Sequence, residues 1–228
     1  MAEEDMLNTR AQAALIVALR RGELRAGQFL SMPQLVDILG LPLAAVREAA
    51  RHASTSGWLE IIPKRGVLIM DARPDLIRDS LDLRMVLDQE GARRRIREAG
   101  GPSGLDALRG AHEQMLAAAR GAPSPDLSPR AIAVDLSLHD FMAEGLDNPL
   151  LRAAYDANRI RIAIIQRVRP FVQERILSAM QEHLAIIDAL QRRDAAAAVE
   201  AIAYHCERTQ HWWGVQTYHQ DGSRYGAG

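Results

Sequence analysis

The chain has 228 residues, 48% of them hydrophobic and 25% charged, which is an ordinary composition for one large or two modest globular domains. A net charge of −1 means that the chain as a whole does not attract nucleic acid, so any DNA contact needs a local basic surface. Cys206 is the single cysteine, which excludes an intrachain disulfide and a thiolate zinc cluster. The acidic start "MAEEDML" and the absence of a long apolar run predict a cytoplasmic protein with no membrane partner.

Three helices are predicted near the start of the chain. Apolar residues recur with a helical period in "NTRAQAALIVALRRGEL", and Asn8 or Thr9 could cap the start of this helix. In "SMPQLVDILG", Pro33 suits the first turn of a short helix and Gly40 suits its end. A third helix is expected over residues 43–54.

A β-hairpin is predicted directly after the third helix. Residues 58–62 and 67–70 are rich in strand-forming side chains and flank the basic tip "PKRG". Two helices joined by a short glycine-containing turn are typical of a helix-turn-helix, and a two-stranded ribbon after them corresponds to a wing. The sequence therefore predicts a winged helix-turn-helix DNA-binding domain over residues 1–72.

Beyond residue 72 the sequence predicts helices alone. Their patterns cover residues 75–100, 105–121, 130–146, 148–168, 173–193 and 194–218. The expected fold class is mainly α, with an all-α bundle of six or seven helices over residues 73–220. Residues 221–228 are expected to form a flexible tail.

Asp135 and His139, in "VDLSLHDF", are four residues apart and therefore lie on one face of a predicted helix. His183 and His205 each border the apolar face of a later helix, so a bundle could bring three imidazoles and one carboxylate together. Imidazole suits Zn²⁺, Ni²⁺, Cu²⁺ or Fe²⁺, and a carboxylate neutralises part of the charge. The alternative is a set of buried histidines satisfied by their neighbours. Three histidines are left out because no pattern pairs them with this face: His112, His211 and His219.

Four segments resemble motifs of a known family. "VREAARHASTSGWLEIIPKRGVLI" is similar to a recognition helix and wing, and "DLRMVLDQEGARR" to the segment that opens an effector domain. "DLSLHDFMAEGLDNPLL" is similar to a D-x-x-F-H motif followed by N-x-x-L, and "EHLAIIDALQRRDAAAAVEAIAYH" to a closing pattern with two histidines. Together they resemble the GntR family of bacterial transcription regulators, in the FadR-like subfamily whose effector domain is called FCD. The resemblance runs from about residue 8 to residue 218.

The resemblance implies a bound divalent metal ion, with Zn²⁺ favoured and Ni²⁺ or Mn²⁺ as alternatives. The residues that match the family's ligands are Asp135, His139, His183 and His205. Arg84 matches an arginine that faces the pocket and pairs with an effector carboxylate, for which the planar guanidinium is suited. Asn158 and Arg161, on the following helix, are predicted to reach the same effector pocket.

The DNA-reading end departs from the family pattern. Leu43 and Ala44 stand where polar or basic residues are expected, and residues 1–70 hold eight Lys or Arg against seven Asp or Glu. That excess is small for a domain that must neutralise phosphates. The predicted DNA contacts are Arg47 and Arg51 on the recognition helix and Lys64 and Arg65 at the wing tip.

The leading hypothesis is a ligand-responsive transcription regulator that is not an enzyme. It would act as a homodimer, reading palindromic double-stranded operator DNA and binding a small organic acid. One alternative is a metal-dependent enzyme in a helical bundle, although a winged module of about 70 residues has no catalytic use. The other is a sensor or scaffold that has lost specific DNA binding, an alternative motivated by Leu43.

Overall fold

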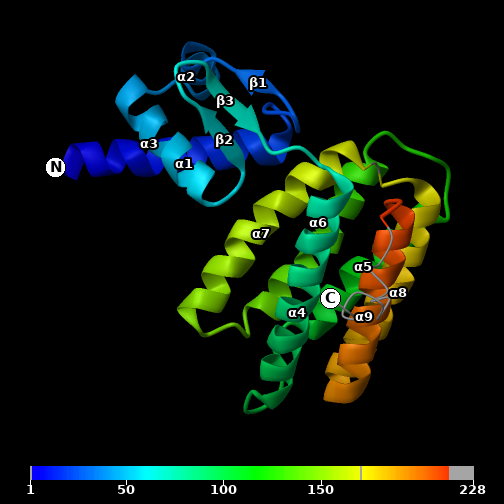
Figure 1. The fold of residues 1–228 in the computed structure, drawn as a ribbon. Coiled ribbons are helices and arrows are strands. Elements are labelled where there is room, and N and C mark those ends of the chain that lie inside the picture. Colours follow the sequence, from blue (N-terminus) through cyan, green and yellow to red (C-terminus); the bar gives the residue numbers. More distant parts are fainter. Residues whose placement is uncertain (1, 170, 216–228) are drawn as a thin grey trace, which may run out of the picture. The chain divides into compact units, whose positions relative to one another are not determined.

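The computed structural model describes residues 2–169 and 171–215, and the predicted tail at residues 221–228 lies outside them. The described residues belong to two compact units. The first unit comprises Met1–Arg73 and Asp147–Phe171, and the second comprises Pro74–Leu146 and Val172–Gly228. Figure 1 shows helices throughout and one small sheet, so the predicted fold class is confirmed. No helix among the described residues combines the length and hydropathy needed to cross a bilayer.

The first helix, α1 (Ala2–Arg21), starts earlier than the sequence pattern indicated. Neither Asn8 nor Thr9 caps it, and the Thr9 hydroxyl donates to the carbonyl of Asp5 one turn back inside the helix. The predicted start was wrong because the preceding "AEEDML" is itself made of good helix formers with acidic side chains at the amino end.

The helix-turn-helix consists of α2 (Met32–Leu39) and α3 (Leu43–Thr55). Ser31 caps α2 through a capping box with Gln34, and Gly40 ends it in the left-handed conformation with φ of 62°. The predicted end at Gly40 is therefore confirmed. The buried face of α3 consists mainly of small residues: Ala45, Val46, Ala49, Ala50 and Ala53.

The wing is a three-stranded antiparallel sheet with the order β1-β3-β2. Its strands are β1 (Phe29–Leu30), β2 (Leu59–Ile62) and β3 (Gly66–Ile69). The predicted hairpin is confirmed, whereas β1 has two residues and leaves no periodic pattern in the sequence. Gly66 is required at the start of β3, because a Cβ there would lie 2.0 Å from the carbonyl oxygen of Leu30.

Helix α7 (Pro149–Val168) belongs to the first unit, together with the winged module. The Trp58 indole donates to the carbonyl of Ala157 over 2.9 Å, and Arg161 donates to the carbonyl of Ser56 over 2.5 Å. Asn148 caps the helix by accepting from two backbone N–H groups. These long-range bonds hold α7 against the turn that follows α3.

The described helices of the second unit are α4 (Pro74–Arg97), α5 (Leu105–Ala119), α6 (Leu127–Ala143), α8 (Gln173–Gln191) and α9 (Ala195–Trp212). Helices α8 and α9 lie side by side, and α4 lies along α9 (Figure 1). One core cluster joins all five helices; its larger members include Leu138, Phe141, Met142, Ile186, Ile187, Leu190 and Ile202. This core holds the inner faces of α6, α8 and α9 in fixed register.

Gly91 sets the close approach of α4 to the end of α6, because a Cβ there would lie 2.3 Å from the carbonyl oxygen of Met142. We expect Gly91→Ala to destabilise the chain by about 1–3 kcal/mol through this overlap. Gly110→Ala on α5 is the matched control, since nothing lies within 4 Å of its added methyl group. It should stabilise by about 0.5–1 kcal/mol, as alanine normally does in a helix. Chemical denaturation measures both, and shifts of the same sign would contradict this packing.

Candidate metal centre

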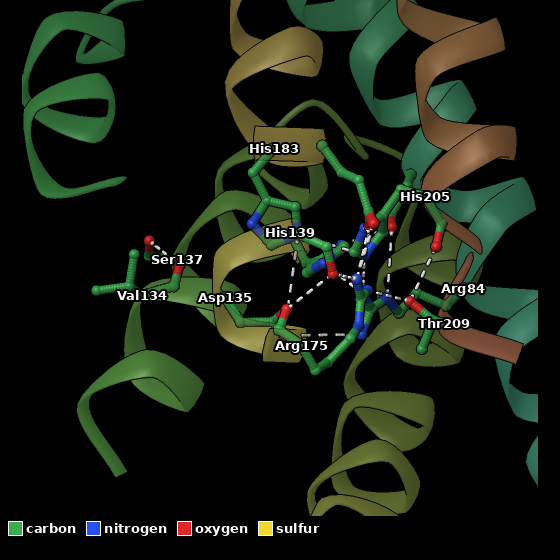
Figure 2. Close-up of polar contacts among 12 residues, drawn as sticks. Arg84, Val134, Asp135, Ser137, His139, Arg175, His183, His205 and Thr209 are labelled. Atoms are coloured by element: carbon green, nitrogen blue, oxygen red, sulfur yellow. Dashed lines mark hydrogen bonds and ion pairs between the residues drawn. The ribbon is translucent and has the colours of Figure 1, made fainter. Parts of the chain in front are cut away.

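Four buried side chains from three helices converge in the second unit. Helix α6 contributes Asp135 and His139, one turn apart, while α8 contributes His183 and α9 contributes His205. Each is at most 3% exposed, and one potential ligand atom from each lies within 4.8 Å of all the others. Figure 2 shows these side chains pointing toward one another. The structure thus brings together the four residues predicted as metal ligands, hereafter the tetrad.

Two tetrad histidines are oriented by buried carboxylates. Nδ1 of His139 lies 2.7 Å from Oδ2 of Asp88, and Nδ1 of His205 lies 2.7 Å from Oε2 of Glu182. A carboxylate accepts a hydrogen bond, so both imidazoles carry their proton on Nδ1 and leave a lone pair on Nε2. Metal-binding histidines in proteins commonly have such a carboxylate partner, which fixes the tautomer and the ring orientation.

Arg84 on α4 provides an internal test of whether the tetrad suits a cation. Its Nη2 lies 2.5 Å from Nε2 of His139 and 3.1 Å from Nε2 of His205, and its Nη1 lies 4.0 Å from Oδ2 of Asp135. The guanidinium donates to both imidazole lone pairs, so a positive charge is already bound by these atoms (Figure 2). The donor set of three imidazoles and one carboxylate fits Zn²⁺ and similar ions.

His183 completes the tetrad from α8. Its Nε2 lies 3.3 Å from Nε2 of His205 and 3.5 Å from Oδ1 of Asp135. Burial holds the pKa of His183 and of His205 well below the usual value, so both imidazoles are neutral near neutral pH. Burial opposes ionisation of Asp135, but the nearby basic groups, Arg84 first among them, together outweigh burial and lower the pKa of this carboxyl. Neutral imidazoles and an ionised carboxylate are the protonation states that a metal requires.

A second buried arginine supports Glu182. Arg175 donates from Nη1 to both oxygens of Glu182, over 2.8 and 2.9 Å, and from Nη2 to the Thr209 hydroxyl over 2.8 Å. Burial raises the pKa of Glu182, and the charge of Arg175 opposes this rise. The arginine therefore keeps a carboxylate available as the acceptor for His205.

Asp88, Glu182 and Arg175 were not predicted from the sequence. Asp88 follows Arg84 by four residues on one helix, a spacing that could have indicated it. Glu182 directly precedes His183, and adjacent residues of a helix point in different directions. No pattern within one helix therefore pairs Glu182 with His205, which lies on the next helix. His112 was left out of the predicted ligands, and the group that could hold a metal does not include it. It is nevertheless completely buried on α5, and its ring centroid lies 5.2 Å from that of His183.

Two residues predicted for the effector pocket lie on α7, in the first unit. Asn158 is 3% exposed there, and Arg161 donates to the carbonyl of Ser56. Arg84, the third residue predicted to bind the effector, belongs to the second unit and lies at the tetrad. The effector roles of Asn158 and Arg161 stay predictions.

The four residues predicted to contact DNA are exposed on the winged module: Arg47, Arg51, Lys64 and Arg65. Arg51 pairs with Glu48 on the same helix, with Nη1 and Oε2 2.5 Å apart. Arg47, one turn earlier on α3, makes no such ion pair with another residue that the structure describes. Leu43 is 42% exposed at the start of α3, so an apolar side chain occupies part of the surface predicted to contact DNA.

This architecture defines a class of protein, in which a winged-helix module is joined to an all-helical domain with a buried histidine and aspartate cluster. The chain belongs to the FCD domain family, whose family model matches residues 79–208. The expected FCD domain is therefore confirmed.

Solved structures share the fold at low sequence identity. Escherichia coli McbR/YncC has a TM-score of 0.74 and 16% identity, with 91% of this chain and 97% of that chain covered. A putative transcriptional regulator GntR from Rhodococcus sp. RHA1 has a TM-score of 0.74 and 18% identity, with 92% and 99% covered. No curated protein matched the chain. The fold expected from the resemblance to GntR regulators is the fold that these structures have.

Proposed function

We propose that this chain is a DNA-binding transcription regulator whose second unit binds a divalent metal ion and a small carboxylate effector. The observation that carries the proposal is the tetrad, with its Nε2 lone pairs converging on a position where Arg84 already places a cation. The residues that would hold the metal are Asp135, His139, His183 and His205. A bound metal would supply a Lewis-acidic centre with open coordination positions for a carboxylate oxygen.

The buried charges around the tetrad favour an anionic effector. Three carboxylates, Asp88, Asp135 and Glu182, face two guanidinium groups, Arg84 and Arg175, so this buried set carries one net negative charge. A divalent cation would change it to one net positive charge. Uncompensated charge is costly inside a protein, and one carboxylate would restore neutrality.

Arg84 links the two binding events. Its guanidinium occupies the Nε2 lone pairs of His139 and His205, so it must withdraw before these nitrogens can serve as ligands. The freed guanidinium would then offer two parallel N–H groups to a carboxylate. In this proposal the centre is a receptor and not a catalyst. A catalyst would need a carboxylate free to act as a general base, and both Asp88 and Glu182 already accept hydrogen bonds from ligand histidines.

The winged module, residues 1–72, would read DNA, and residues 73–220 would sense the effector. A homodimer in the cytoplasm would present two recognition helices to the half-sites of a palindromic operator. The effector controls DNA binding only if it binds the DNA-competent and DNA-incompetent states with different affinities. Whether the regulator represses or activates depends on where the operator lies.

Arg47→Ala tests the DNA-binding half of the proposal. We expect about fivefold or greater loss of affinity for the chain's own promoter region, because an arginine contact to a base contributes about 1–3 kcal/mol. The melting temperature should change little, since Arg47 is exposed. Fluorescence anisotropy of labelled promoter DNA at low salt measures the affinity. Arg130→Ala, which removes an exposed arginine from α6, is the control and should bind like wild type. Absence of DNA binding by the wild-type chain would overturn the proposal.

A further inference from the structure

His112 and His183 form a buried pair of imidazoles with complementary unused atoms. Both side chains are 0% exposed, and their ring centroids lie 5.2 Å apart. Within the described part of the chain, neither Nε2 of His112 nor Nδ1 of His183 has a hydrogen-bond partner. Buried polar atoms without a partner are rare in native proteins and need an explanation.

The tautomers of the two rings can be inferred from their other nitrogens. Nδ1 of His112 lies 2.8 Å from the carbonyl oxygen of Leu108, which can only accept, so the proton of His112 is on Nδ1. Its Nε2 therefore carries a lone pair. His183 directs Nε2 toward Asp135 and His205, so as a metal ligand it must carry its proton on Nδ1. One unused atom is thus an acceptor, and the other becomes a donor when metal is bound.

We propose that His112 is a positioning residue, whose Nε2 accepts a hydrogen bond from Nδ1–H of His183 in the metal-bound protein. This inference rests on the proposed metal site. With the ring centroids 5.2 Å apart, the bond would require a small shift of the two rings or one bridging water. The bond gives the third ligand histidine the orienting partner that Asp88 provides for His139 and Glu182 provides for His205.

The neutral character of His112 suits its place. His112 is completely buried on α5, and the partner of its Nδ1 is the backbone carbonyl of Leu108 and not a carboxylate. The tetrad is already surrounded by three buried carboxylates, including the ligand Asp135. A fourth carboxylate beside His183 would by itself neutralise the metal-bound set, and no net charge would remain for a carboxylate effector to balance. A neutral imidazole orients the ligand and leaves that charge in place.

The test compares His112→Leu with His112→Gln in the full-length chain, using Zn²⁺ alone as the probe. Leucine fills a similar volume but accepts no hydrogen bond, whereas glutamine restores an amide oxygen as an acceptor. Competition with a chromophoric chelator should show about 10–100-fold weaker zinc binding for His112→Leu. His112→Gln should bind within several-fold of wild type. His211→Leu, at an exposed position on α9, should leave the affinity unchanged.

A spectroscopic measurement separates this bond from a packing role. In zinc-loaded chain with ¹⁵N-labelled histidine, Nδ1–H of His183 should give a slowly exchanging, downfield proton signal in wild type and His112→Gln. That signal should be lost in His112→Leu. Equal zinc affinity of wild type and His112→Leu, equally weak binding by both variants, or a signal that survives in His112→Leu would each overturn the hydrogen bond alone. Absence of zinc binding by the wild-type chain would instead overturn the proposed metal site, and the bond with it.

Discussion

His183→Ala is expected to lower the bound divalent metal from about one ion per chain to a small fraction, because it removes one of the four ligands. It should also abolish stabilisation by added metal. A ligand present at about 100 times its Kd stabilises the folded state by about 2.7 kcal/mol. For a chain of this size that corresponds to a rise of roughly 5–10 °C in melting temperature. Elemental analysis after gel filtration and thermal melting with and without Zn²⁺ measure the two effects.

His211→Ala is the matched control for this substitution. His211 lies on α9, six residues beyond His205, but its side chain is exposed. It should keep the full metal content and the full thermal shift. If His183→Ala instead retains metal like this control, the assignment of the ligands is wrong.

Arg84→Ala is expected to separate effector binding from metal binding. Loss of the guanidinium should weaken the binding of small carboxylates by about 30-fold or more, since truncating one partner of a buried charge pair costs about 2–5 kcal/mol. Zinc affinity should not fall, because the Arg84 guanidinium no longer competes with zinc for His139 and His205. Asp88 and Asp135 also lose the positive charge of Arg84, so their negative charge is free to attract the metal ion. Calorimetric titration of the zinc-loaded chain with a panel of mono- and dicarboxylic acids measures the first effect.

Arg84→Lys refines this result. Lysine keeps the positive charge but lacks the planar fork, so it should bind carboxylates with an affinity between those of wild type and Arg84→Ala. Arg84→Ala could instead bind every acid like wild type and lose zinc. That result would show that the arginine supports the metal site and does not bind the effector.

The sequence was sufficient for the features that depend on short-range patterns. The winged module was predicted from the helical periods, from Gly40 as the end of a helix and from the hairpin around "PKRG". The i,i+4 spacing of Asp135 and His139 and the apolar faces beside His183 and His205 predicted which side chains point inward. These patterns work because side-chain direction repeats with the helix turn, and burial of the apolar face fixes the rotation of each helix.

The sequence was insufficient where partners come from different helices. The bond between Glu182 and His205 joins α8 to α9, and the contact of His112 with His183 joins α5 to α8. Such pairs depend on the crossing angles and the register of packed helices, which no single-helix pattern encodes. The early start of α1 and the two-residue strand β1 were missed for local reasons: one begins within an unpatterned run of helix formers, and the other is too short to show a period.

The proposed coupling between Arg84 and DNA reading is tested most directly by promoter DNA affinity of the zinc-loaded chain, measured by anisotropy with and without small carboxylic acids. We predict that at least one acid changes the affinity about 5–150-fold in wild type, the range expected for allosteric coupling of about 1–3 kcal/mol. Arg84→Ala should bind the same DNA but show no change with that acid. Unchanged DNA affinity in wild type, with acids shown by calorimetry to occupy the site, would contradict the account.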